Sequence, residues 1–372
     1  MKPDYTQSIL NIPCTLMAHY GMEVYHATLP LLSAKLKDKD HIVLVVLDGF
    51  GNNLLKTHLD PNGFMHRHRL MTLTSVFPST TTAATTALLT GLSAYESGFL
   101  GWFQYFKQYD TYFTTFLGED YYEPHKAIHH DFKDFFKRDT FLDQVKAAHA
   151  SIDTAAYFPK PIDRNGYESR ADGFLSLLSH LKSKQKTLSY FYVVEPDLTQ
   201  HKVGPFDART HMTVHTLENE LEHLQKALPP RSCVIVTADH GLTAVEPIPL
   251  HEDRVLMDML EHRPANEARA TTFFVKPKHE AEFIKHFNAH YGDAYQLYDK
   301  ETILKEGWYG FGKRHPFIDT CLGQFVAVAT QNKFFTLGDS GPQFKGHHAG
   351  ITTDEMIVPL IVFLGDDTHE RL

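Results

Sequence analysis

Cysteine is scarce in this chain, and its distribution excludes several classes of protein. Three cysteines, Cys14, Cys233 and Cys321, occur among 372 residues, and they are far apart. An odd number of widely spaced cysteines argues against a disulfide framework and against a thiolate-rich metal site. Cys233 lies within an apolar run, so we expect it to be a buried core thiol.

Long hydrophobic runs are also absent. The longest, residues 356–364, has nine residues including a proline, whereas a membrane-spanning helix needs about 20 apolar residues. The N-terminus, MKPDYTQSIL, carries an early acid and has no apolar signal-peptide core. We therefore expect no membrane partner and a cytoplasmic location.

Basic charge is in deficit. The formal net charge of -9 argues against binding to duplex nucleic acid, which needs a basic surface. It does not argue against small phosphorylated substrates, because a bound metal can invert the local field. The composition, 42% hydrophobic and 22% charged, is typical of a globular protein and leaves the oligomeric state open.

Strand and helix patterns alternate along the chain. Runs that are apolar on both faces cover residues 41–47, 188–194 and 233–237, and helical patterns cover residues 82–89, 173–181 and 210–227. This alternation predicts an α/β fold with a mostly parallel sheet sandwiched between helices.

The pattern changes after residue 268. ATTFFVKP is followed by the helical KHEAEFIKHFNAHYG, which predicts a small α+β insertion. We therefore expect a core formed by residues 1–268 and 323–372, and an inserted subdomain formed by residues 269–322.

Acidic clusters follow each predicted strand. Asp48 follows the first, Asp197 the second, and Asp239 with His240 the third. Ligands of open α/β sheets bind at the carboxyl ends of strands, so these clusters predict one site. Asp197 and His201 are four residues apart, so on a helix they share a face and can hold one metal. The 25 histidines and few cysteines suit nitrogen and oxygen ligation.

The stretch VFPSTTTAATTALLTG, residues 76–91, carries seven hydroxyl residues in sixteen. Serine and threonine cap helices and allow close packing, which is one explanation. The alternative is a nucleophile at a helix N-terminus, where free N–H groups and the helix dipole favour a bound phosphate. The stretch by itself leaves both open.

Five motifs follow one another along the chain: LVVLDGFG, PSTT with LLTG, PDLTQHKVGP, TADHG, and GHHAG with TTDEM. Together they resemble the alkaline phosphatase superfamily, and most of all its type I phosphodiesterase/nucleotide pyrophosphatase branch. The resemblance implies an alkaline-phosphatase-like core and two zinc ions, with manganese as an alternative. One ion would be held by Asp48, Thr81, Asp239 and His240, and the other by Asp197, His201 and His348.

The resemblance also implies the reaction. The family's nucleophile lies nine residues before the threonine of a Thr-Gly pair, so Thr90 points to Thr81, with Thr80 as the near alternative. His348 is preferred to His347 because a small residue and a glycine follow it. Zinc coordination would lower the pKa of the Thr81 hydroxyl, and attack on a small-molecule phosphate ester would give a phosphothreonine.

One departure affects the substrate. Trp102 stands where nucleotide pyrophosphatases have an asparagine that binds a phosphate oxygen. Eleven aromatic residues lie within residues 99–122, and we favour core packing for them over a stacking wall for substrate. Lys345, beside the histidine loop, is expected to be exposed. The leading prediction is a two-zinc phosphoric ester hydrolase, a phosphodiesterase/nucleotide pyrophosphatase that acts through a phosphothreonine. The alternatives are a phosphomonoesterase, a metal-dependent phosphomutase, or an inactive metal-binding relative.

Overall fold

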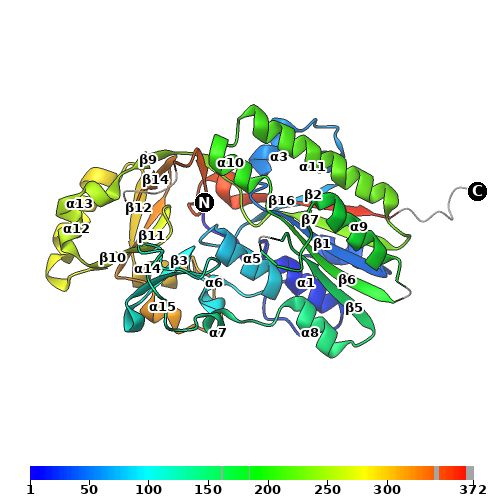
Figure 1. Cartoon of the computed structure of the whole chain (residues 1–372), viewed down its shortest axis with the longest axis horizontal. Coiled ribbons are helices and arrows are strands. Elements are labelled where there is room, and N and C mark those ends of the chain that lie inside the picture. The colour runs from blue at the N-terminus through cyan, green and yellow to red at the C-terminus, as the bar shows by residue number, and fades with distance from the viewer. Residues whose placement is uncertain (161, 184, 339–342, 366–372) are drawn as a thin grey trace, which may run out of the picture.

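The computed structural model describes residues 1–160, 162–183, 185–338 and 343–365. Two six-stranded sheets lie beside each other, with the central sheet on the right of Figure 1. The strands of the central sheet are β1 (His41–Leu47), β2 (Arg69–Thr74), β5 (Ile152–Tyr157), β6 (Lys186–Val193), β7 (Ser232–Thr237) and β16 (Ile357–Leu364).

The central sheet has the order β2-β16-β7-β1-β6-β5, and β16 is the strand that runs against its neighbours. Strands β1 and β7 are buried at every position. Such complete burial is expected where helices cover both faces of a sheet, and it explains why these runs are apolar throughout. The prediction of a mostly parallel α/β core is confirmed.

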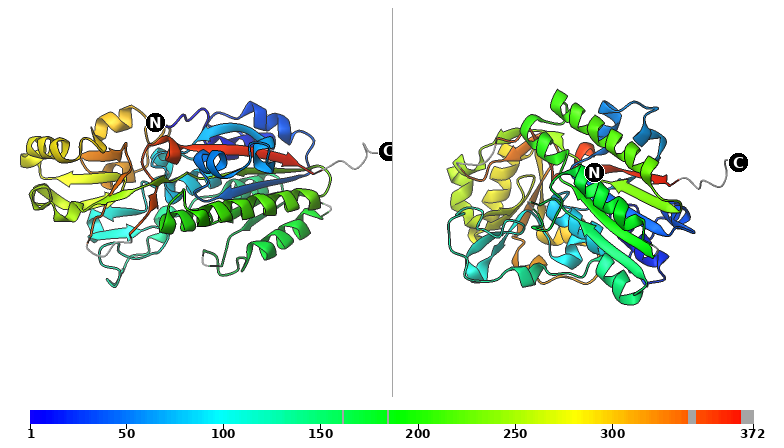
Figure 2. Two further views of the ribbon diagram at one scale, coloured as in Figure 1. Left: turned by 90° about the horizontal axis from the view of Figure 1, so that it is seen from above. Right: turned by 45° about the vertical axis from the view of Figure 1, so that its right-hand side comes forward.

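Helices flank both faces of the central sheet, with α11 and α9 on one side and α1 on the other (Figure 2). Helices α5, α9 and α11 begin one to three residues before the predicted patterns and end within one residue of them. In the described part of the chain, no helix has the length and apolarity that a membrane crossing requires. The helices are α1 (Asn11–His19), α2 (Pro30–Leu36), α3 (Asn52–His58), α4 (Phe64–Arg67), α5 (Thr81–Thr90), α6 (Ala94–Ser97), α7 (Lys133–Phe136), α8 (Phe141–Ala148), α9 (Arg170–Leu181), α10 (Asp197–Val203), α11 (Ala208–Ala227), α12 (Arg254–Met259), α13 (Glu280–Tyr291), α14 (Lys300–Lys305), α15 (Phe317–Thr320) and α16 (Thr353–Met356).

The second sheet is antiparallel, with the order β12-β13-β11-β10-β3-β4. Two short strand pairs complete the sheets of the described residues, β14 (Lys333–Phe335) with β9 (Glu246–Ile248), and β15 (Gly346–His347) with β8 (Thr243–Ala244). The strands of the second sheet are β3 (Phe103–Phe106), β4 (Thr111–Thr114), β10 (Leu260–Asn266), β11 (Ala270–Val275), β12 (Tyr295–Asp299) and β13 (Phe325–Ala329).

The second sheet contains the predicted strand-helix module, as β11 followed by α13. It also includes β3, β4, β10 and β13, which lie outside residues 269–322. The boundaries at residues 269 and 322 stay a prediction, and residues 366–372 of the predicted core lie outside the described residues.

The aromatic stretch forms the β3–β4 hairpin and its flanks. Phe106 and Phe113 are buried and pack against Phe132, with ring centroids 4.9 and 4.3 Å apart. Phe103 stacks on Tyr121 at 3.7 Å. These contacts support the packing interpretation. The three cysteines are buried free thiols, as expected for Cys233.

Candidate active site

The candidate site lies at the carboxyl ends of three adjacent strands of the central sheet. Asp48 follows β1, Asp197 is the first residue of α10 after β6, and Asp239 and His240 follow β7. Because β7, β1 and β6 are parallel neighbours, these side chains meet at one edge of the sheet.

The first group of ligands joins Asp48, Asp239 and His240, whose ligand atoms lie within 4.8 Å of one another. His240 Nε2 is 3.5 Å from Asp48 Oδ1 and 3.5 Å from Asp239 Oδ2. Thr81 Oγ1 lies 3.2 Å from the same Nε2 atom. The structure therefore brings together the four residues expected to hold one metal.

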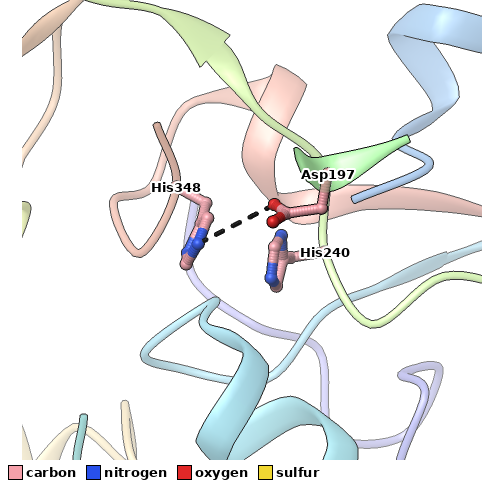
Figure 3. A group of neighbouring side chains, drawn as sticks. All are labelled: Asp197, His240 and His348. Atoms are coloured by element: carbon pink, nitrogen blue, oxygen red, sulfur yellow. Dashed lines mark ion pairs between the residues drawn. The ribbon is translucent and has the colours of Figure 1, made fainter. Parts of the chain in front are cut away.

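The second group joins Asp197, His240 and His348 (Figure 3), with ligand atoms again within 4.8 Å of one another. His348 Nε2 is 4.0 Å from Asp197 Oδ1, and His201 Nε2 is 3.4 Å from that oxygen. The His240 and His348 rings stack with centroids 3.9 Å apart. The two groups therefore adjoin, with His240 common to both. The sequence placed it in one group.

Backbone carbonyls orient two of the histidines. His201 Nδ1 is 2.9 Å from the Gly346 carbonyl oxygen, and His240 Nδ1 is 3.2 Å from the Gly241 carbonyl oxygen. A proton on each Nδ1 satisfies these contacts and leaves the Nε2 lone pair for a metal, which is the usual outer contact of a ligating histidine.

Two of the carboxylates are also oriented. Asp239 Oδ1 accepts hydrogen bonds from the backbone N–H groups of Gly49, at 3.0 Å, and His240, at 2.9 Å. The Tyr192 hydroxyl donates to Asp48 Oδ2. Each carboxylate thus has one oxygen held by the protein and one turned to the cluster.

The carboxylate oxygens that the protein does not hold are suited to binding a cation. Asp48 Oδ1, Asp197 Oδ1 and Asp239 Oδ2 are buried and have no hydrogen-bond partner among the described residues. Leaving such an atom unpaired costs about 1–3 kcal/mol, so a bound cation would relieve three costs together. Carboxylate oxygens with imidazole nitrogens suit zinc and manganese.

The protonation states agree with this fit. Burial, followed by the charges of neighbouring carboxylates, raises the pKa values of Asp48 and Asp197. Burial lowers the pKa of His201 to about 4 and that of His348 well below its ordinary value. The imidazoles are therefore neutral at pH 7, and the crowded carboxylates lack a neutralising charge that a cation would supply.

The threonine-rich stretch separates into two roles. Thr82, Thr85 and Thr86 donate to the carbonyl oxygens of Gly101, Thr81 and Thr82, as helix packing and capping predict. Thr81 begins α5, and its hydroxyl faces His240.

The two adjacent histidines of the GHHAG loop differ. His348 reaches Asp197, whereas His347 Nδ1 accepts the His348 backbone N–H at 2.9 Å and its ring packs on Phe334. The Ala349 N–H donates to the Ser79 carbonyl oxygen at 2.9 Å, which fixes the loop against the segment that precedes Thr81. Lys345 is exposed, as predicted.

Sequence reasoning missed Tyr192 and Glu267, among others. Tyr192 could have been noticed as a tyrosine within a strand buried on both faces. Glu267 gave no signal, because its contact is with a distant segment. Its Oε1 accepts the Trp102 N–H at 2.6 Å, and burial raises its pKa to about 7.

Comparisons with known proteins agree with the motifs. Residues 42–351 match the family model of Type I phosphodiesterase / nucleotide pyrophosphatase. A Naja atra venom phosphodiesterase is 33% identical over 84 residues, which is 21% of this chain and 10% of the venom protein's length.

Solved structures share the fold. One is murine ectonucleotide pyrophosphatase / phosphodiesterase 5, as an inactive threonine-to-alanine variant in complex with AMP. It has a TM-score of 0.60 and 20% identity, over 87% of each chain. The human protein of that name has a TM-score of 0.61 and 18% identity, over 86% of this chain and 87% of that one. The similarity confirms the alkaline-phosphatase-like fold.

Proposed function

Because this chain belongs to the type I phosphodiesterase/nucleotide pyrophosphatase family, as its motifs predicted, we propose that it hydrolyses phosphoric esters with two metal ions and Thr81 as the nucleophile. The observation that carries the proposal is the Thr81 hydroxyl at 3.2 Å from His240, the histidine common to both ligand groups. The inactive murine relative, in which alanine replaces a threonine, supports a threonine nucleophile and substrates of the nucleotide type.

Two zinc ions, or manganese, are proposed for the site. Asp48, Thr81, Asp239 and His240 would hold one, and Asp197, His201 and His348 would hold the other. A divalent cation supplies two effects here, since it lowers the pKa of a coordinated hydroxyl and stabilises charge on phosphoryl oxygens.

The residues of the chain then perform the substitution. Thr81 Oγ1 gives up its proton to water and attacks phosphorus, the bond to the leaving ester oxygen breaks, and that oxygen leaves as an alcohol after taking a proton from water. The phosphoryl group, which in a diester still carries its second ester, is left on Thr81. The free N–H groups of the first turn of α5 orient a non-bridging oxygen. Water then cleaves the phosphothreonine and restores the hydroxyl.

The expected cytoplasmic location stays a prediction, which fractionation of cells expressing tagged protein would test.

Diesters are the proposed substrate class. A monoester dianion concentrates charge on three terminal oxygens and requires an added cation or donor. Trp102 instead presents a partly buried indole, and the Glu267 carboxyl lies against its backbone. An apolar wall does not solvate a dianion, whereas it accepts the second ester group of a diester.

The test compares kcat/KM for bis-p-nitrophenyl phosphate and p-nitrophenyl phosphate on one zinc-loaded preparation. We expect the diester to be preferred. A monoester preference would favour the phosphomonoesterase or phosphomutase alternative and refute the diesterase proposal. Bound zinc with no turnover of either ester would favour the inactive relative.

A further inference from the structure

The turn between β10 and β11, residues 267–269, connects the second sheet to the segments that carry the site's histidines and Thr81. Its two charged side chains, Glu267 and Arg269, are only 3% and 0% exposed. Buried charges are costly unless they are paired and hydrogen-bonded. The partners of these two side chains lie on the segments that carry the ligands and the nucleophile.

Arg269 pairs with Glu355 at full burial. Its Nε and Nη2 atoms donate to Glu355 Oε1 and Oε2, both at 2.7 Å, in a bidentate salt bridge. Its Nη1 atom donates to the carbonyl oxygens of Gln331 and Lys333. The guanidinium is therefore fixed on three sides, and so is the carboxylate that it binds.

Glu355 in turn holds both histidine loops. Its Oε1 atom accepts the Gly350 N–H at 2.8 Å, two residues after His348. Its backbone carbonyl accepts the Gly241 N–H at 2.9 Å, directly after His240. A Cβ atom on Gly350 would lie 2.8 Å from Arg269 Nη2, so the loop also packs directly on the guanidinium.

Glu267 contacts the nucleophile segment. Its carboxyl accepts the Trp102 N–H, and the Thr80 hydroxyl also faces it. Thr80 precedes Thr81 in the chain, and Thr82 is bonded to the carbonyl oxygen of Gly101 at 2.9 Å. Glu267 therefore ties together the two segments between which the nucleophile is held.

We propose that Arg269, acting through Glu355, positions the loops of His240 and His348 for metal binding, and that Glu267 positions Thr81 for attack. Both are positioning residues, and the inference rests on the proposed function of the site. A purely structural role predicts a loss of stability alone. Positioning predicts two separate effects, one on metal affinity and one on kcat.

The experiment has two arms. The first, the nucleophile arm, tests the positioning of Thr81 by comparing Glu267→Leu with Glu267→Gln. Leucine removes the acceptor for Trp102 at similar volume, and we expect kcat for bis-p-nitrophenyl phosphate to fall about tenfold or more while zinc stays bound through Asp48, Asp239 and His240. Glutamine keeps an acceptor oxygen and should restore most of kcat. Wild-type kcat in the leucine variant, or an equal loss in both variants, would overturn this arm.

The metal arm removes both charges of the buried pair, because a single change would leave one buried charge unpaired. We expect the Arg269→Met/Glu355→Gln variant to fold and to bind zinc about tenfold more weakly in competition with a chromophoric chelator. Arg170→Met/Glu220→Gln is the control, since that partly exposed pair has the same bidentate contact, between α9 and α11.

The outcomes separate this inference from the proposed function. Wild-type zinc affinity in the Arg269→Met/Glu355→Gln variant, or an equal loss in the control, would overturn the metal arm. Failure of the wild-type protein to bind zinc or to hydrolyse any ester would instead refute the proposed function. Circular dichroism and thermal unfolding of each variant distinguish a misfolded protein from a folded protein in which the histidine loops or Thr81 are displaced.

Discussion

Replacing Glu267 by glutamine should stabilise the protein at alkaline pH and not at acidic pH. The folded-state pKa of this carboxyl is about 7, against an ordinary value of 4.5, because it is buried. The folded protein therefore holds a proton between about pH 4.5 and pH 7 that the unfolded chain has lost. The stability that this proton contributes is fully present below about pH 4.5 and is lost as the pH rises through 7.

The size of the effect follows from the shift. Each pKa unit corresponds to about 1.4 kcal/mol, so between pH 5 and pH 8 the wild-type protein should lose about 2–3 kcal/mol from this group. Glutamine resembles the protonated acid and cannot lose the proton. The difference in unfolding free energy between Glu267→Gln and wild type should therefore grow in favour of the variant by about that amount.

Urea denaturation of both proteins at pH 5 and pH 8, with chelator present, measures this difference while other titrating groups cancel. Glu261→Gln, an exposed change on the same strand β10, controls for the loss of one acidic residue. A Glu267→Gln difference that is the same at both pH values would refute the burial argument.

Three further predictions concern the metals. Zinc at about 1,000 times its Kd should stabilise the folded protein by about 4 kcal/mol per site, raising Tm by about 5 °C for 372 residues, and calorimetry with and without chelator would measure the shift. Tyr192→Phe, which removes the hydrogen bond to Asp48, should weaken zinc binding about 10–100-fold in a chelator competition, and unchanged affinity would contradict the role of that bond. Asp239→Asn should remove one equivalent of zinc by elemental analysis and lower kcat by more than about 100-fold, beyond the effect of losing an outer contact.

The sequence predicts the centre of the site well, for a physical reason. Parallel strands buried on both faces are long apolar runs, so β1, β6 and β7 are visible and their carboxyl ends locate Asp48, Asp197 and Asp239. The spacing from Thr90 points to Thr81 only through the resemblance to the family, whose nucleophile lies nine residues before the threonine of its Thr-Gly pair.

Contacts between distant segments are not predictable in this way. The second sheet joins β3 and β4 to β10 and β13 across more than 140 residues, and no local pattern encodes such antiparallel pairing. Arg269 and Glu355 are 86 residues apart, and each taken singly resembles an ordinary surface charge. The same limit hid Glu267, whose partner is a backbone N–H group 165 residues away.

The role of Thr81 as nucleophile is tested most directly by turnover of bis-p-nitrophenyl phosphate by Thr81→Ala and Thr80→Ala, each loaded with zinc. We expect Thr81→Ala to lose at least about 1,000-fold in kcat while its metal content and circular dichroism match wild type, because the attacking oxygen is gone and the other ligands remain. Thr80→Ala should be far milder. Near-wild-type turnover by Thr81→Ala, or a reversed order of the two variants, would contradict the assignment.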